Sequence, residues 1–285
     1  DTAYDVAWVR YADVMAHMLP YIEQRFGKYL YPQYSFIQGG DGGMEYAMAT
    51  LVTTSSIGLA FHEWMHNWYQ QVLGTNESKY PWMDEGFTEY AAAILNNYYL
   101  KTFRKSQLIN NAKELKKLDS ILTRKPLMHS ESYDSYFEMV ASEKEEPLTT
   151  QAYHFESNRT YGNSVYSKGS IFLNQLGYIV GTSTLDTILL RYYDMWKLKH
   201  PRPEDFMRIA ERISNMELDW YYEYWINTTK HIDYAIDSVF EDNGSTKVFL
   251  SRVGQMPMPI DIAIEDIEGR KIYLHIPLDM TLNPR

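Results

Sequence analysis

Two histidines and two glutamates near residue 65 have the types and spacing of a hydrolytic metal site. His62 and His66 lie four residues apart, Glu63 follows the first of them, and Glu85 comes after eighteen further residues. On an α-helix, side chains four residues apart lie on one face, about one turn from each other. Both imidazoles could therefore bind one metal ion at roughly 2.0–2.1 Å. A His-Glu-x-x-His helix is typical of a zinc site with two histidine ligands and a glutamate general base.

The neighbouring residues predict two helices that would hold this motif. Polar residues 54–56 can cap a helix N-terminus, an apolar run leads into the motif, and Gly74 can end the helix. Residues 80–87 predict a turn into a second helix, Glu89 to Tyr99. Two antiparallel helices joined in this way would carry Glu85 to the histidine face. Three protein ligands would leave a fourth position for water, as in catalytic zinc sites.

A chance arrangement of polar residues on a helix is the alternative to a metal site, because a motif match is only a hypothesis. The capping residues, the second helix and the third ligand all weigh against chance. The remaining histidines are scattered without ligand spacing, and we assign no role to His17, His129, His154, His200, His231 and His275.

Composition excludes several classes of protein. With 285 residues, 45% of them hydrophobic, the chain can form one large domain or one domain and part of another. The formal net charge of −10 argues against nucleic acid as a partner, because phosphate binding needs a basic face. The absence of cysteine excludes disulfides and thiolate zinc sites, so His, Glu or Asp would have to hold zinc. No apolar run approaches 18 residues, so we predict no transmembrane helix.

Hydrophobic periodicity predicts an α+β fold that is mainly helical, with a small N-terminal β element. Besides the two helices described above, helices are expected at residues 7–26, 167–177, 183–195 and 203–213. Residues 34–38 and 44–51 predict two strands joined by the glycine-rich turn 39–43, where backbone could approach a ligand closely. The polar segment 132–159, with its acidic stretch 143–146, predicts a solvated surface loop.

The pattern changes to strands from about residue 237, and alternation predicts strands at 247–250, 260–264 and 271–276. Three strands with exposed edges would be marginally stable alone. We therefore predict a catalytic domain at residues 1–236 and a partial, truncated β-domain at 237–285. We also expect the chain to be part of a longer protein, since it begins inside a helix-like pattern at Asp1. No targeting segment indicates a compartment.

Several segments together resemble the aminopeptidase N-like zinc metallopeptidases, which are gluzincins with a thermolysin-like catalytic domain. The matching segments are Gly-Gly-Met-Glu-Tyr at 42–46, His-Glu-Trp-Met-His-Asn-Trp at 62–68, Trp-Met-Asp-Glu-Gly-Phe at 82–87, Val-Tyr-Ser-Lys-Gly at 165–169, and 218–225. The resemblance covers roughly residues 1–235 and continues weakly into the β-domain. It implies a thermolysin-like, mainly helical catalytic domain. It also implies further N- and C-terminal domains, which we expect to complete the cleft.

The resemblance assigns the chemical roles. It implies that His62, His66 and Glu85 bind one zinc ion per chain and that Glu63 activates the zinc-bound water. Tyr166 is similar in position to the phenol that stabilises the tetrahedral oxyanion in the family. Tyr161 competes for that role but does not match the motif.

The resemblance also implies how substrate is held. Glu45 is similar in position to the carboxylate that binds the free α-amino group of the substrate, and Gly42, Gly43 and Met44 would run beside the peptide backbone. An ordinary exposed strand residue is the alternative for Glu45. The family motif commonly ends in Asn where this chain has Tyr46. The role of that side chain is therefore left open.

Three further polar residues could orient the ligands. Glu89 lies four residues after Glu85, on the same helix face, and could accept the second N–H of a ligand histidine. Asp84 and Asn67 could act in the same way. For each of them, an ordinary helix side chain is an equally good interpretation.

The sequence thus predicts a zinc-dependent aminopeptidase that hydrolyses the N-terminal peptide bond of peptides with a free N-terminus. A zinc endopeptidase with the same metal site is the first alternative, and N-acetylated peptides would distinguish the two. The second alternative is a catalytically silent scaffold or binding fragment, although all four metal-site residues are present. The preferred N-terminal residue cannot be predicted from these motifs.

Overall fold

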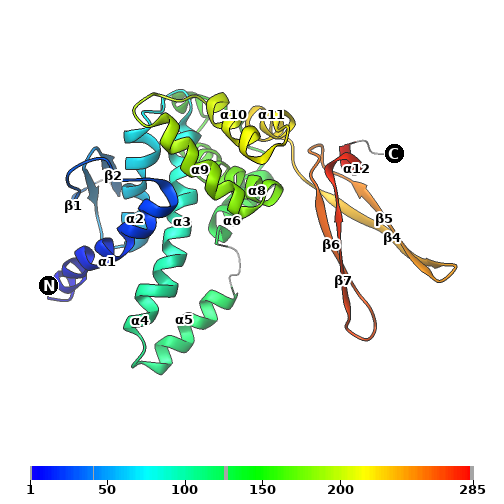
Figure 1. The fold of residues 1–285 in the computed structure, drawn as a ribbon, viewed down its shortest axis with the longest axis horizontal. Coiled ribbons are helices and arrows are strands. Elements are labelled where there is room, and N and C mark those ends of the chain that lie inside the picture. The colour runs from blue at the N-terminus through cyan, green and yellow to red at the C-terminus, as the bar shows by residue number, and fades with distance from the viewer. Residues whose placement is uncertain (1, 41, 125–127, 283–285) are drawn as a thin grey trace. The chain divides into compact units, whose positions relative to one another are not determined.

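The computed structural model describes residues 2–40, 42–124 and 128–282, and the chain forms two compact units, residues 1–222 and 223–285 (Figure 1). Asp1, where a helix-like pattern was expected to begin, and Asp41, part of the predicted glycine-rich turn, lie outside the described residues. The domain boundary predicted after residue 236 remains a prediction.

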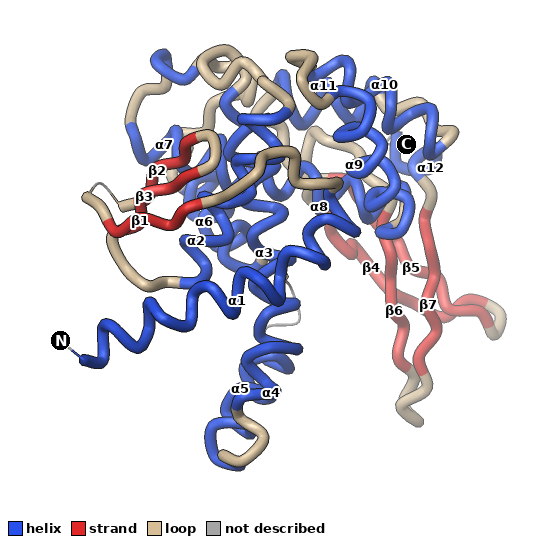
Figure 2. The backbone as a smooth tube through the Cα atoms, turned by 60° about the vertical axis from the view of Figure 1, so that its left-hand side comes forward, coloured by secondary structure: helices blue, strands red, loops and turns tan. Residues whose placement is uncertain are grey.

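The N-terminal part of the larger unit combines a long helix with a small mixed sheet. Helix α1 (Thr2–Phe26) precedes strands β1 (Ser35–Gln38), β2 (Gly43–Tyr46) and β3 (Ala49–Val52). The strand order is β1-β3-β2, with β1 parallel and β2 antiparallel to β3. The single strand predicted at 44–51 was wrong, because Met48, with φ +67°, makes a tight turn that divides it. Figure 2 shows this sheet on the flank of the helical unit.

Two central helices, with the turn between them, carry the histidine motif and the third candidate ligand, Glu85. Helix α2 (Ile57–His66) begins as predicted, with the Ser56 side chain accepting a hydrogen bond from Leu59 N. It continues as a π-helical turn, Asn67–Val72, and the chain then reverses at Gly74, with φ +67°. Helix α3 (Phe87–Tyr99) follows a second π-helical turn, Trp82–Gly86. The turn predicted at 80–87 is therefore largely helical.

Further α-helices are α4 (Lys105–Gln107), α5 (Ala112–Arg124), α6 (Ser130–Ala141), α7 (Asn158–Tyr161), α8 (Gly169–Val180), α9 (Thr182–Trp196), α10 (Pro203–Ser214) and α11 (Asp219–Asn227). A π-helical turn, Gly162–Lys168, joins α7 to α8. The loop predicted at 132–159 was wrong in part, because most of α6 lies within it. None of the helices in the described ranges combines the length and apolar character needed to span a bilayer.

Aromatic side chains form much of the core of the larger unit. Trp82 and Phe172 lie edge to face with ring centroids 5.2 Å apart, and Phe87 and Phe206 do so at 5.0 Å. Such pairs bury large apolar areas in a defined geometry. They pack α3 against α8 and α10, so the segment that carries Glu85 rests on a rigid base.

The smaller unit contains two antiparallel hairpins. β4 (Tyr234–Asp242) pairs with β5 (Ser245–Arg252), and β6 (Ile260–Glu265) pairs with β7 (Lys271–Ile276), which precedes α12 (Leu278–Leu282). The three predicted strands are present. The additional strand, β4, has weaker alternation because most of its residues on both faces are exposed.

Candidate active site

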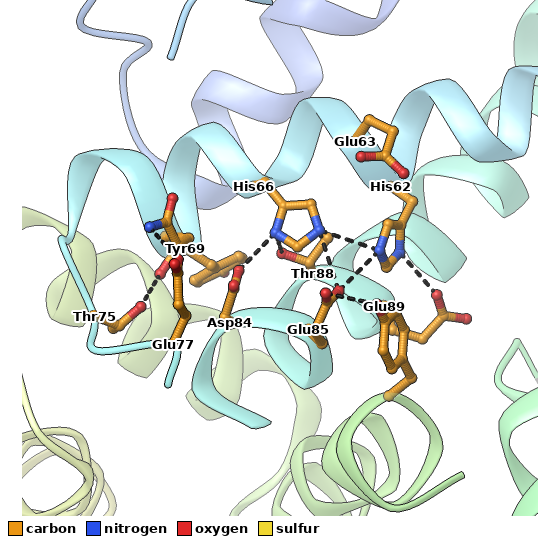
Figure 3. Close-up of polar contacts among 12 residues, drawn as sticks. His62, Glu63, His66, Tyr69, Thr75, Glu77, Asp84, Glu85, Thr88 and Glu89 are labelled. Atoms are coloured by element: carbon orange, nitrogen blue, oxygen red, sulfur yellow. Dashed lines mark hydrogen bonds and ion pairs between the residues drawn. The ribbon is translucent and has the colours of Figure 1, made fainter. Parts of the chain in front are cut away.

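Helices α2 and α3 bring the two histidines and Glu85 together. Glu85 Oε2 lies 3.1 Å from His62 Nε2 and 3.2 Å from His66 Nε2, and the two Nε2 atoms are 3.2 Å apart (Figure 3). The four-residue spacing on α2 places both imidazoles on one face, and the π-helical turn before α3 points Glu85 toward them. The predicted convergence of the three side chains is therefore present in the structure.

The donor set fits a tetrahedral zinc ion. The candidate ligand atoms of His62, His66 and Glu85 all lie within 4.8 Å of one another. Bonds of roughly 2.0–2.1 Å at the tetrahedral angle place ligand atoms about 3.3 Å apart. The observed separations of 3.1 and 3.2 Å are close to this value. Two imidazoles and a carboxylate are also the donor types of catalytic zinc sites.

Each histidine also contacts a second carboxylate through its other ring nitrogen, Nδ1. Glu89 Oε2 lies 3.1 Å from His62 Nδ1, and Asp84 Oδ1 lies 2.6 Å from His66 Nδ1. Burial alone would lower the pKa of His62, but its hydrogen bonds to Glu85 and Glu89 raise that pKa to about 9. This surplus of carboxylates therefore favours a positive charge between the helices.

The sequence motifs did not indicate Thr88, which is buried beside the same histidine. Its Oγ1 atom lies 3.4 Å from His66 Nδ1. Thr88 follows Glu85 by three residues, so helical spacing places it on the same face of the chain. That spacing was the signal that could have found it.

Glu63 lies in a tight space between α2 and strand β2. It is 5% exposed, and a Cβ atom built on Gly43 would lie 2.1 Å from Glu63 Oε1. Only glycine therefore lets β2 pass this close to the carboxylate. Burial raises the pKa of Glu63 to about 7, against the opposing effect of the two histidines. Oxygen atoms of Glu45 and Glu63 and a ring nitrogen of His66 also lie within 4.8 Å of one another.

Strand β2 carries the other residues predicted to contact substrate. It is an edge strand of the sheet, and Gly42, immediately before it, has φ +79°. The Gly42 carbonyl accepts hydrogen bonds from Thr53 N and Thr53 Oγ1, both at 2.9 Å. The side chains of Met44 and Tyr46 are exposed. The backbone of this segment is thus fixed by β3 on one side.

The Asn67 side chain interacts with the small sheet, not with the histidine rings. Its Oδ1 atom accepts a hydrogen bond from Met48 N at 3.3 Å, so the side chain holds the turn between β2 and β3. Among the predicted orienting residues, Asp84 and Glu89 contact the histidines directly, whereas Asn67 supports the neighbouring sheet.

Tyr166 approaches the same cluster from the π-helical turn before α8. Its hydroxyl donates a hydrogen bond of 2.6 Å to Glu85 Oε1, and its ring stacks on His62 with centroids 5.6 Å apart. Burial, with the nearby Glu85 carboxylate, raises the pKa of Tyr166, so the phenol keeps its proton. The Tyr161 ring lies 6.1 Å from that of Tyr166. The structure therefore gives Tyr166 the direct contact with the cluster.

A cavity of about 740 Å³ opens beside these residues. Its wall includes His62, Glu63 and Tyr166, and it extends along α3 to residues of α5 and α6 such as Leu122 and Ser132. This volume lies in the usual range for ligand sites. The cavity offers room for a short peptide next to the candidate metal ligands.

Comparison with known proteins assigns the chain to a family. The family model described as the peptidase family M1 domain matches residues 11–225, well over half of the chain. The chain belongs to peptidase family M1. The resemblance seen in the motifs is thereby confirmed.

Among curated proteins, two aminopeptidase B sequences are similar to the chain. The Mus musculus protein is 25% identical over 251 residues, which cover 82% of this chain and 34% of that protein. The Rattus norvegicus protein is 26% identical over 257 residues, which cover 84% of this chain and 34% of that protein. The chain thus spans about a third of the length of these relatives.

Solved structures show the fold of an M1 catalytic domain. The M1 zinc metallopeptidase from Deinococcus radiodurans has a TM-score of 0.57 at 18% identity, covering 75% of this chain and 43% of that one. A mutant of it was solved with a Tyr-Ser-Ala substrate, with a TM-score of 0.55 at 16% identity and 74% and 43% covered. Yeast LTA4 hydrolase in complex with bestatin has a TM-score of 0.54 at 18% identity, covering 76% of this chain and 35% of that one. The predicted fold class is confirmed.

Proposed function

We propose that the chain carries the catalytic domain of a zinc-dependent aminopeptidase, which hydrolyses the N-terminal peptide bond of peptides. One observation carries the proposal. A metal-binding triangle of His62, His66 and Glu85 lies beside a buried carboxylate, Glu63, and within reach of a second carboxylate, Glu45. Family membership supports the metallopeptidase class, and residues 1–236 would form the domain.

The metal would be held by His62, His66 and Glu85, and Asp84 and Glu89 would orient the imidazoles through their Nδ1 atoms. When bound, zinc polarises the substrate carbonyl and lowers the pKa of water toward about 7. Because these carboxylates occupy the Nδ1 side of each ring, the Nε2 atoms would be left to hold the metal.

Glu63 would move the proton. Its carboxylate would accept a proton from the attacking water and pass it to the nitrogen of the leaving amine. A general base works best when its pKa is near the working pH, and burial raises the pKa of Glu63 to about 7. Glycine at position 43 leaves room for the carboxylate in the narrow space where this transfer would occur.

Tyr166 would stabilise the charge that develops on the carbonyl oxygen. A donor aimed at that oxygen is worth most in the transition state, where the negative charge is greatest. The Tyr166 hydroxyl already lies at the metal-binding triangle, 2.6 Å from Glu85 Oε1. Because its pKa is raised, it would act as a hydrogen-bond donor.

Glu45 would select peptides with a free amino terminus. A carboxylate in a partly buried site pairs with an ammonium group through charge-assisted hydrogen bonds, which an internal peptide segment cannot make. The segment Gly42, Gly43 and Met44 lies at a sheet edge, where an extended peptide can add as a further strand. The Tyr-Ser-Ala substrate of the similar Deinococcus protein supports peptides as the substrate class.

The experiment uses the intact protein that contains this chain. Zinc content is measured together with hydrolysis of one peptide in free and N-acetylated forms. We expect one zinc per chain and cleavage of the free peptide only. Glu63→Gln should keep the zinc and lose turnover by about 10²–10⁴-fold, the usual contribution of a general base.

Other outcomes would point to a different function. Equal cleavage of the acetylated peptide would indicate an endopeptidase. Bound zinc without hydrolysis of any peptide in a broad panel would indicate a binding module. Either result contradicts the aminopeptidase proposal.

A further inference from the structure

A buried ion pair lies beside the turn that carries Tyr166. Lys168 Nζ is 2.6 Å from Glu145 Oε1, and the two side chains are 1% and 4% exposed. Glu145 belongs to the acidic stretch that the sequence predicted to be solvated. Burial lowers the pKa of Lys168, and the Glu145 carboxylate opposes that effect. The two charges thus meet where water is nearly excluded.

A buried ion pair fixes position more than it adds stability. Desolvation of two charges offsets most of their attraction, so an apolar pair of similar size would often be as stable. Separating the partners is strongly destabilising, however, because it leaves an uncompensated charge in a buried place. Lys168 and Glu145 therefore hold their two segments in one arrangement.

The place of Lys168 on its turn makes this arrangement relevant to Tyr166. Both residues lie in the π-helical turn Gly162–Lys168, two positions apart. Side chains two residues apart on a helical turn do not face the same side. Tyr166 points to Glu85, whereas Lys168 points to Glu145. A rotation of the turn that moved the phenol away from Glu85 would also pull Lys168 from Glu145.

A contact between two glycines fixes the other side of the turn. A Cβ atom on Gly86 would lie 2.7 Å from Gly169 Cα, and one on Gly169 would lie 2.9 Å from Gly86 Cα. Gly86 follows Glu85, and Gly169 follows Lys168. The backbone segments that carry Glu85 and Tyr166 are therefore in contact. This contact restricts translation of the turn Gly162–Lys168, and the ion pair restricts its rotation.

We propose that Lys168 is a positioning residue, which through its buried ion pair with Glu145 holds the Tyr166 hydroxyl at the metal-binding triangle. This inference rests on the proposed role of Tyr166 as an oxyanion donor. It also requires Glu145, which lies outside the site in the segment between α6 and α7.

The test compares Glu145→Gln in two backgrounds of the intact, zinc-loaded protein, the natural one and Tyr166→Phe. Turnover, the Michaelis constant, zinc content and melting temperature are measured for each. With Tyr166 present, we expect kcat to fall about tenfold with the Michaelis constant and zinc content unchanged, because only a transition-state interaction is lost. In the Tyr166→Phe background, the same substitution should change kcat less than about twofold, since coupled residues are not additive.

Two further variants act as controls. Lys168→Arg keeps the charge and should restore most of the turnover that Lys168→Met loses. Asp119→Asn removes the ion pair with Lys105, which has a similar length of 2.7 Å but exposed side chains (46% and 47%), and should leave kcat unchanged. If Glu145→Gln does not fold, the double variant Lys168→Met/Glu145→Leu removes both buried charges and should show the same dependence on Tyr166.

An equal loss of turnover in both backgrounds would overturn the inference, because the effect would not act through Tyr166. Unchanged turnover in both backgrounds would overturn it too. Full activity of Tyr166→Phe alone would contradict the proposed role of Tyr166, and with it this inference. That result would leave the roles of the metal ligands and Glu63 untouched, so the two failures are distinguishable.

Discussion

Helix pair α2–α3 and strand β2 meet at one site but hold their residues in different ways. His66 and Asp84 have side chains 1% and 5% exposed, and the His66 ring contacts the side chains of Asp84 and Glu85. On β2, the Met44 and Tyr46 side chains are exposed, and the ordering comes from backbone bonds to β3. The proposed chemistry thus lies in a rigid region with many side-chain contacts, and the proposed substrate contact lies on an edge strand.

The largest effect is expected where the two regions touch. Gly43→Ala would place a Cβ 2.1 Å from Glu63 Oε1, so the strand or the carboxylate must move. We expect turnover to fall about 10²-fold, within the range for a displaced general base, while zinc content is retained.

Gly40→Ala is the matched control for this substitution, because a Cβ there meets nothing within 4 Å. It should leave steady-state kinetics unchanged. Normal turnover in Gly43→Ala would show that Glu63 does not depend on the close approach of β2.

An intermediate effect is expected within the helix pair. Asp84→Asn should weaken zinc affinity by about 10–100-fold, as loss of a carboxylate behind a ligand histidine typically does. Glu89→Gln should have a smaller effect, because the Glu89 side chain is 32% exposed and water can replace it. Competition with a chelator measures both affinities. An unchanged affinity in Asp84→Asn would mean that the ligands need no second carboxylate.

A smaller effect on kinetics is expected from a substitution on strand β2 alone. Glu45→Gln keeps the size of the side chain but removes the charge that would pair with the substrate ammonium. We expect the Michaelis constant for free-amine peptides to rise about tenfold or more, the value of one hydrogen bond to a charged group. Zinc content should not change. A similar rise for a substrate that lacks the amino group would argue against ammonium binding by Glu45.

The sequence predicted the parts of the site whose geometry is local. A helix at α2 is enough to place His62 and His66 on one face, and a second, antiparallel helix is enough to bring Glu85 back to that face. The π-helical turn at 82–86 was not predicted, and its Gly86 lies against Gly169, a residue that is far away in the chain and that no local pattern places there. Glu145 was misjudged for the same reason. An acidic stretch is usually solvated, and the lysine that meets this one lies in another segment.

The proposed function requires one zinc ion between α2 and α3. Anomalous X-ray diffraction from crystals of the intact protein, measured on both sides of the zinc absorption edge, tests it most directly. We predict a single anomalous peak within bonding distance of His62 Nε2, His66 Nε2 and a Glu85 carboxylate oxygen. No peak at that position in zinc-supplemented crystals, or a zinc ion bound elsewhere with these side chains still bonded to one another, would contradict the account.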